Sequence, residues 1–207
     1  MSEHSIIKAM ARHTTITDDQ ILDAARTVFI EEGFRARTSK VAQLAGVSEG
    51  TIFKRFETKE RLFLAALQIP YPAPWHGLLE RLAGDGDVRE NLITIGVGML
   101  TFFQQTIPQM LAAAGVKFGP PPGPHHPDEH MDRMIQNDLD KIHDYLKHEQ
   151  DLGRIRKMNP RLLAAMLFGC FANPALRAAL PEEQTDAEIR LSAEEMVDIL
   201  WSGLRPE

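Results

Sequence analysis

Two short helical segments separated by a tight turn constrain the fold more than any other feature of this sequence. Residues 38–44 and 49–56 each carry apolar side chains at helical spacing, and Ala45-Gly46-Val47 lies between them. Gly46 suits a turn because glycine tolerates a left-handed backbone, and Ser48 is a good N-cap for the second segment. The pattern is typical of a helix-turn-helix motif.

A further helix is predicted on each side of this motif. Thr17 is a good N-cap for the preceding helix, and Gly33 ends it. Thr58 can cap the following helix, which three prolines at 70, 72 and 74 prevent from continuing past Ile69. We therefore expect a flexible arm over 1–16, a helix-turn-helix domain over 17–69 and a second domain over 70–207.

The second domain is also expected to be helical. The sequence predicts helices over 76–83, 88–106, 128–153 and 159–179, with Pro108 breaking or kinking the second of these. Asn159 followed by Pro160 is a strong helix start, and Ser192 is a candidate N-cap for the last helix. No segment has a convincing strand pattern, so the predicted fold class is all-α, a helix-turn-helix domain followed by a larger helical bundle.

The charge distribution favours contact with nucleic acid at one end of the molecule. The formal net charge is -6, yet residues 33–61 hold seven basic residues against three acidic ones. A basic domain on an acidic body suits a protein that meets phosphate at one end only.

The single cysteine, Cys170, excludes an intramolecular disulfide, and neither a signal peptide nor a membrane span is apparent. We expect a cytoplasmic protein without membrane contact, with Met10 as an alternative start to Met1.

Residues 41–56 read VAQLAGVSEGTIFKRF and residues 59–62 read KERL. This stretch, with Ala24-Ala25 and Phe29 before Gly33-Phe34, resembles the tetracycline-repressor (TetR) family, whose pattern is roughly I-A-x-x-A-G-V-S-x-G-x-[LI]-[YF]-x-x-F-x-x-K-x-x-L. The resemblance covers about residues 17–67. The chain departs from the family in being about one residue short between Gly33 and Val41, and in having Phe53 where tyrosine is commoner, which removes one hydroxyl that can bind phosphate.

The resemblance implies a homodimeric repressor that a small molecule releases from a palindromic DNA operator. The helix at 49–56 would enter the major groove, where Glu49 either accepts a hydrogen bond from cytosine or only compensates the helix dipole. Gly50 would allow close approach to the groove. The expected DNA-binding residues are Arg37, Thr38, Ser39, Lys40, Gln43, Ser48, Glu49, Gly50, Thr51, Phe53, Lys54 and Lys59.

A ligand pocket and a dimer interface are expected in the second domain. Deformable and aromatic side chains suit an apolar or amphipathic effector; the predicted pocket residues are Trp75, Met99, Phe102, Phe103, Thr106, Met110 and Met134. The last two long helices would pair with those of a second copy. Their predicted interface residues are Leu163, Met166, Leu167, Phe171, Val197, Leu200 and Trp201.

Three alternative functions stay open at this stage. The first is a metal-responsive regulator, because His125, His126 and His130 lie close together in the sequence. The second is a helical interaction module whose helix-turn-helix no longer binds DNA. An enzyme is disfavoured, since no nucleophile elbow, phosphate-binding loop or zinc-type spacing is present and Cys170 lies on an apolar stripe. No cofactor and no metal site is predicted.

Overall fold

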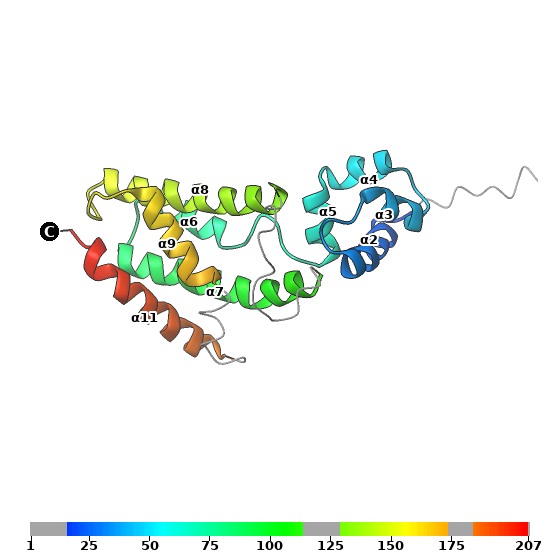
Figure 1. The fold of residues 1–207 in the computed structure, drawn as a ribbon. Helices are drawn as coiled ribbons and strands as arrows, with labels where there is room; N and C mark the ends of the chain where they lie inside the picture. The colour runs from blue at the N-terminus through cyan, green and yellow to red at the C-terminus, as the bar shows by residue number, and fades with distance from the viewer. Residues whose placement is uncertain (1–15, 114–128, 174–183, 207) are drawn as a thin grey trace, which may run out of the picture. The chain divides into compact units, whose positions relative to one another are not determined.

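The computed structural model describes residues 16–113, 129–173 and 184–206, which contain nine helices and no strand (Figure 1). The predicted all-α fold class is confirmed for this part of the chain. The described residues form two compact units, one ending at Gln68 and a larger one beginning at Ile69. The arm predicted over 1–16 lies outside the described residues, except for Ile16.

From Ile16 to Gln68, the first unit contains four helices, α2 (Asp18–Glu32), α3 (Thr38–Ala45), α4 (Glu49–Phe56) and α5 (Lys59–Ala66). Three of them begin at the N-caps that the sequence predicts. Thr17 and Gln20 form a capping box on α2, Ser48 accepts from the Thr51 amide, and Thr58 accepts from the Arg61 amide. Short helices such as α3 and α4 depend on these caps and on packing for their stability.

An aromatic cluster forms the core of the first unit. The Phe63 ring meets Phe29 and Phe34 edge to face, with centroids 5.1 and 4.9 Å apart. Ile21, Val41 and Ile52 are fully buried, so α2, α3 and α4 each contribute to one core. Gly46 has a positive φ of 69° at the end of α3, a left-handed conformation that favours glycine in the turn.

The larger unit contains α6 (His76–Leu82), α7 (Val88–Ala113), α8 (Glu129–Asp151), α9 (Pro160–Ala172) and α11 (Asp186–Leu204). Helix α8 packs against α6 and α9. At the C-terminal end of α9, the Phe171 ring lies so close to Gly96 of α7 that a Cβ there would lie 2.6 Å from it. Glycine at this position therefore permits the close crossing of α7 and α9.

Three predicted helix boundaries are wrong. The helix predicted over 159–179 ends at Ala172, because Asn173 precedes Pro174 and the residue before a proline is disfavoured in a helix. Helix α7 continues past Pro108 to Ala113, because Pro108 is exposed and water can satisfy the carbonyl that loses its amide partner. Helix α11 begins at Asp186 rather than after Ser192. Thr185 and Glu188 form a reciprocal capping box there, whereas Ser192 is buried inside the helix and its hydroxyl accepts from the Gln184 amide.

The loop between α6 and α7 is fastened to the end of α8 by buried polar groups. The Gly84 amide donates to Glu149 Oε1 at 2.8 Å, and Glu149 Oε2 lies 3.0 Å from Arg154 Nε in an ion pair. Arg154 also donates to the carbonyl oxygens of Asp85 and Gly86. Because Glu149 is fully buried, these contacts are needed to offset the cost of removing its carboxylate from water.

Candidate nucleic-acid interface and apolar pocket

The N-terminal edge of α4 is exposed, while the opposite face of the same helix is buried. Ser48, Glu49 and Gly50 are exposed and Thr51 is half-buried, whereas Ile52 has no exposed surface. One face of the helix thus anchors it in the aromatic core, and the first turn presents its side chains outward. This is the arrangement that a helix needs to enter a groove of DNA.

Hydrogen bonds hold the side chains along this edge. Ser48 Oγ accepts from the Thr51 amide and lies 2.9 Å from the Thr51 hydroxyl. Across the turn, the hydroxyl of Thr38 at the start of α3 donates to Glu49 Oε1 at 2.5 Å. Helices α3 and α4 are therefore fixed relative to each other by side chains predicted to contact DNA.

Gly50 leaves open space at the centre of the edge. A Cβ built on Gly50 would meet only Ser48 Oγ, at 3.7 Å, an ordinary van der Waals distance. Its φ is not in the left-handed region, so neither crowding nor backbone conformation within this unit requires glycine. The fold itself thus gives no reason for glycine at position 50.

The predicted phosphate-binding residues differ in their surroundings. Arg37, Ser39 and Lys54 are exposed. Lys40 is also exposed but lies 2.7 Å from Glu32, and the Lys59 ammonium lies 4.7 Å above the Phe34 ring. These contacts are within the protein, so Lys40 and Lys59 would have to exchange or share them in order to bind phosphate.

Two further side chains of the predicted interface, Gln43 and Phe53, are exposed, Phe53 to 39%. An exposed phenylalanine on a helix with a buried core face is available for contact with a partner. For Arg55, the sequence predicted either contact with DNA or exposure to solvent. In the structure its guanidinium donates to the Ile16 carbonyl and forms an ion pair with Asp18 at 2.9 Å. It thereby ties the beginning of α2 to α4.

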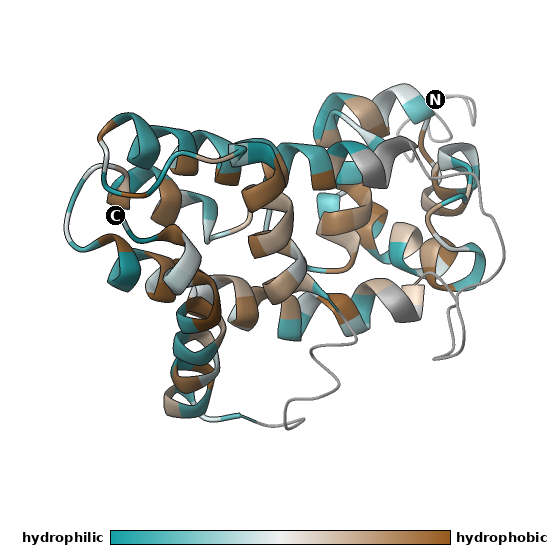
Figure 2. Ribbon diagram, turned by 60° about the vertical axis from the view of Figure 1, so that its left-hand side comes forward, coloured by the Kyte–Doolittle hydropathy of each residue, from teal (hydrophilic) through white to brown (hydrophobic). Residues whose placement is uncertain are grey.

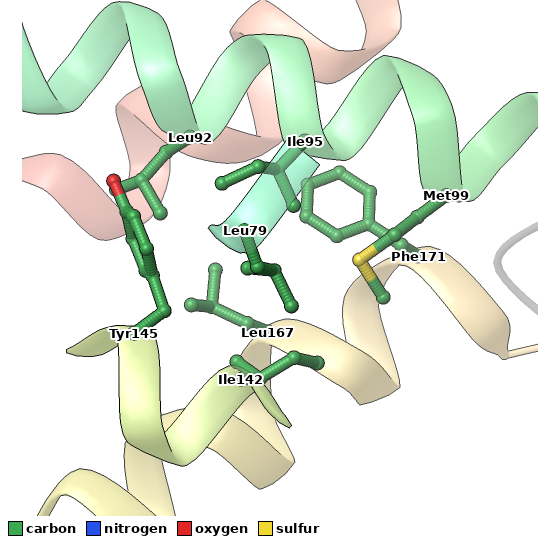
Figure 3. A pocket seen from close by; sticks show the side chains of 8 residues that line it. All are labelled: Leu79, Leu92, Ile95, Met99, Ile142, Tyr145, Leu167 and Phe171. Atoms are coloured by element: carbon green, nitrogen blue, oxygen red, sulfur yellow. The ribbon is translucent and has the colours of Figure 1, made fainter. Parts of the chain in front are cut away.

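A small apolar pocket lies in the core of the larger unit (Figure 3). Its cavity volume is about 10 Å³, enough for roughly one water molecule, so a larger guest has to move side chains. Its walls come from α6, α7, α8 and α9. The lining residues are Leu79, Leu92, Ile95, Met99, Ile142, Tyr145, Leu167 and Phe171.

Of the predicted pocket residues, only Met99 lines this pocket. Trp75 is fully buried with its ring 6.3 Å from that of Phe103, and the buried Thr106 hydroxyl donates to the Phe102 carbonyl within α7. Phe102, Met110 and Met134 are half-buried. Sequence reasoning missed Tyr145, although it lies on the same stripe of the amphipathic helix α8 as Ile142 and Glu149, with spacings of three and four residues.

The residues predicted for a dimer interface fall into two groups. Leu163, Leu167, Phe171 and Val197 are buried in the core of the unit, whereas Met166 is exposed and Leu200 and Trp201 are half-buried. Other apolar side chains on the same two helices are exposed, namely Leu162 on α9 and Leu191 and Ile199 on α11. Figure 2 shows this mixture on α11, where apolar and hydrophilic residues recur along the helix.

The histidine cluster considered as a metal site cannot be built from the described residues. His125 and His126 lie outside them, and of His130 only the backbone is described. Among the described side chains, no group of three or more His, Cys, Asp or Glu is arranged to hold a metal ion.

Within the same ranges, none of the helices combines the length and apolarity that a bilayer span requires.

Comparison with known proteins points to one family. The family described as "Bacterial regulatory proteins, tetR family" matches residues 21–66. The uncharacterized HTH-type transcriptional regulator YvkB of Bacillus subtilis is 29% identical over 160 residues, which cover 75% of this chain and 81% of YvkB. The HTH-type transcriptional regulator QacR of Staphylococcus aureus is 40% identical over 52 residues, 25% of this chain and 28% of QacR.

Solved structures of the same architecture cover nearly the whole chain. The transcriptional regulator FadR of Bacillus subtilis, solved in complex with stearoyl-CoA, superposes with a TM-score of 0.58. The match covers 90% of this chain and 99% of that one, at 19% sequence identity. At this identity the likeness concerns the fold, a helix-turn-helix unit followed by a larger helical unit.

Proposed function

We propose that this chain, which matches the TetR family of bacterial regulatory proteins over residues 21–66, is a repressor that leaves a palindromic operator when a small molecule binds its larger unit. The observation that carries the proposal is the exposed first turn of α4 on a helix whose other face is anchored in a core. Since an operator lies on the chromosome, the protein acts in the cytoplasm.

In this proposal, α4 reads bases and the residues around it bind the DNA backbone. Thr51 presents its methyl to a thymine, because its hydroxyl already lies 2.9 Å from Ser48 Oγ. Gln43 can form a bidentate contact with adenine. The exposed residues Arg37, Ser39 and Lys54 bind the backbone phosphates. The hydrogen bond between Thr38 and Glu49 holds α3 and α4 at the angle that the groove requires.

The operator contacts require two copies of the chain, because a single domain of this size buries little surface on DNA. We propose that the second copy packs on the exposed apolar residues of α9 and α11, chiefly Met166 and Ile199, which are 48% and 77% exposed. Gly169 and Gly203 lie on the same helices, and nothing lies within 4 Å of the space that a Cβ would fill there. These positions allow helices of the second copy to approach closely.

The small molecule would enter the apolar pocket of the larger unit. The pocket is nearly closed, so binding selects a conformation in which its walls have separated. A ligand that binds the separated conformation more tightly shifts the protein toward it, typically with a coupling of about 1–3 kcal/mol. This shift would be what lowers the affinity for the operator.

Selection of binding sites from a pool of random duplexes tests the proposal. We expect the chain to enrich a near-palindrome, to bind it as a dimer, and to give footprints over both half-sites. A selection that enriches no sequence over random DNA would instead favour the interaction-module alternative. Transcription in vitro from a promoter that contains the selected site then distinguishes repression from activation.

A further inference from the structure

The exposed first turn of α4 carries one charged side chain, the carboxylate of Glu49. A negative charge at this edge opposes binding to DNA, because the phosphates of the duplex repel it. No lysine or arginine of the described residues forms an ion pair with Glu49 that would neutralise it. The carboxylate therefore lowers the affinity for DNA in general, unless a hydrogen-bond donor on the DNA meets it.

The Glu49 side chain does not turn back to cap its own helix. Ser48 accepts from the Thr51 amide, and no backbone amide of the described residues donates to Glu49. Glu49 instead reaches across the turn to α3, which packs beside α4 (Figure 1), and its Oε1 accepts from the Thr38 hydroxyl at 2.5 Å. Compensation of the helix dipole needs no partner on α3, so the dipole alone does not explain this orientation.

The bond from Thr38 holds one oxygen of Glu49 and leaves the other available. Within the described ranges no group donates to Glu49 Oε2, and the side chain is exposed, so Oε2 can accept from a partner outside the chain. A side chain that is already held by a neighbour loses less conformational freedom when it binds. Thr38 thus prepares the Glu49 carboxylate for a second hydrogen bond.

Cytosine is the base that best matches a carboxylate oxygen in the major groove. A carboxylate only accepts hydrogen bonds, which excludes guanine and thymine, because both present acceptors there. Adenine presents its N6 amine beside the N7 acceptor, which repels a negative charge. Cytosine presents its N4 amine without an acceptor of its own at that edge.

We propose that Glu49 is a specificity-determining residue whose Oε2 accepts a hydrogen bond from N4 of a cytosine in each half-site, and that Thr38 positions it. The proposal deepens the DNA-binding function and rests on it, since it names one base that α4 reads. Thr38 then serves the interface through Glu49 rather than through a phosphate. Because the carboxylate is repelled by sequences that lack this cytosine, it adds specificity at some cost in affinity.

Selection from random duplexes with the full-length protein tests the proposal by a change of base preference. The unsubstituted protein should enrich cytosine at one position of each half-site, and replacing that base alone should weaken binding about tenfold. Glu49→Gln keeps the shape of the side chain, but its amide both donates and accepts, which matches N7 and N6 of adenine. The preference at this position should change from cytosine to adenine, with the other positions unchanged.

Asp19→Asn is the matched control, because it also replaces a carboxylate with an amide at the exposed first turn of a helix, α2. It should leave every base preference unchanged. Two variants test the positioning role of Thr38. Thr38→Val should reduce the preference for cytosine about threefold, the effect of losing one weak hydrogen bond, whereas Thr38→Ser keeps the hydroxyl and should retain the preference.

The outcomes separate this inference from the proposed function. A common increase in affinity of Glu49→Gln for all duplexes, with no changed base preference, would overturn the inference and leave Glu49 as a dipole-compensating residue. Equal preferences in Thr38→Val and Thr38→Ser would overturn the positioning role. In both cases an enriched near-palindrome leaves the proposed function standing. If the unsubstituted protein enriches no sequence, the proposed function fails together with the inference.

Discussion

Replacing Gly50 with alanine separates the stability of α4 from its contact with DNA. The added Cβ meets only Ser48 Oγ at 3.7 Å, so the folded protein accommodates it without strain. Alanine in a helix is favoured over glycine by about 0.5–1 kcal/mol, and the variant should therefore be slightly more stable. If α4 lies in the major groove, the same methyl group occupies space between helix and DNA. Crowding of this kind costs about 1–3 kcal/mol in a tightly packed site, or roughly 5–150-fold in Kd.

The assay measures denaturant unfolding and operator affinity on the same preparation. Gly77→Ala is the matched control, because Gly77 is an exposed helical glycine in α6 with nothing within 4 Å of the added Cβ. The control should gain similar stability without a change in affinity. Should Gly50→Ala gain stability and still bind the operator within twofold of the unsubstituted protein, close approach of the first turn of α4 to DNA would be refuted.

Three further predictions follow from exposure and charge. Lys54→Ala should lower the slope of log Kd against log salt by about one on any duplex, whereas Lys157→Ala in the larger unit should leave the slope unchanged. Ile199→Glu should convert dimer to monomer in sedimentation velocity, and Ile135→Glu on α8 should not; a dimer that survives both excludes α11 as the interface. Glu149→Ala should lower the free energy of unfolding by about 3 kcal/mol in denaturant titrations, since it leaves the Gly84 amide and Arg154 without their buried partner; a loss below about 1 kcal/mol would contradict that role.

The sequence predicted the helix-turn-helix unit well because local signals there agree with one another. Thr17, Ser48 and Thr58 cap the helices that they were expected to cap, and Gly46 adopts the left-handed turn. The start of α11 was missed although Thr185 and Glu188 carry the capping-box pattern, because Ser192 offered a competing cap nearer the apolar stripe.

The larger unit was harder to predict because α9 is apolar around most of its circumference. Periodicity then identifies a helix but not which of its faces meets the monomer core, so Leu163 and Leu167 were assigned to an interface and lie in the core instead. The pocket posed a related difficulty. Its walls come from four helices between residues 76 and 172, so no local sequence pattern indicates which of their side chains meet there.

The spacing of half-sites tests the central claim most directly, namely that two copies of α4 read adjacent turns of one duplex. Once the operator is selected, about five base pairs, half a helical turn, are inserted between its half-sites, and a second duplex receives a full turn of about ten. We predict that the half-turn insertion reduces affinity to the level of a single half-site, because it rotates one half-site to the opposite face of the DNA. Equal affinity for the original and half-turn duplexes would contradict the claim.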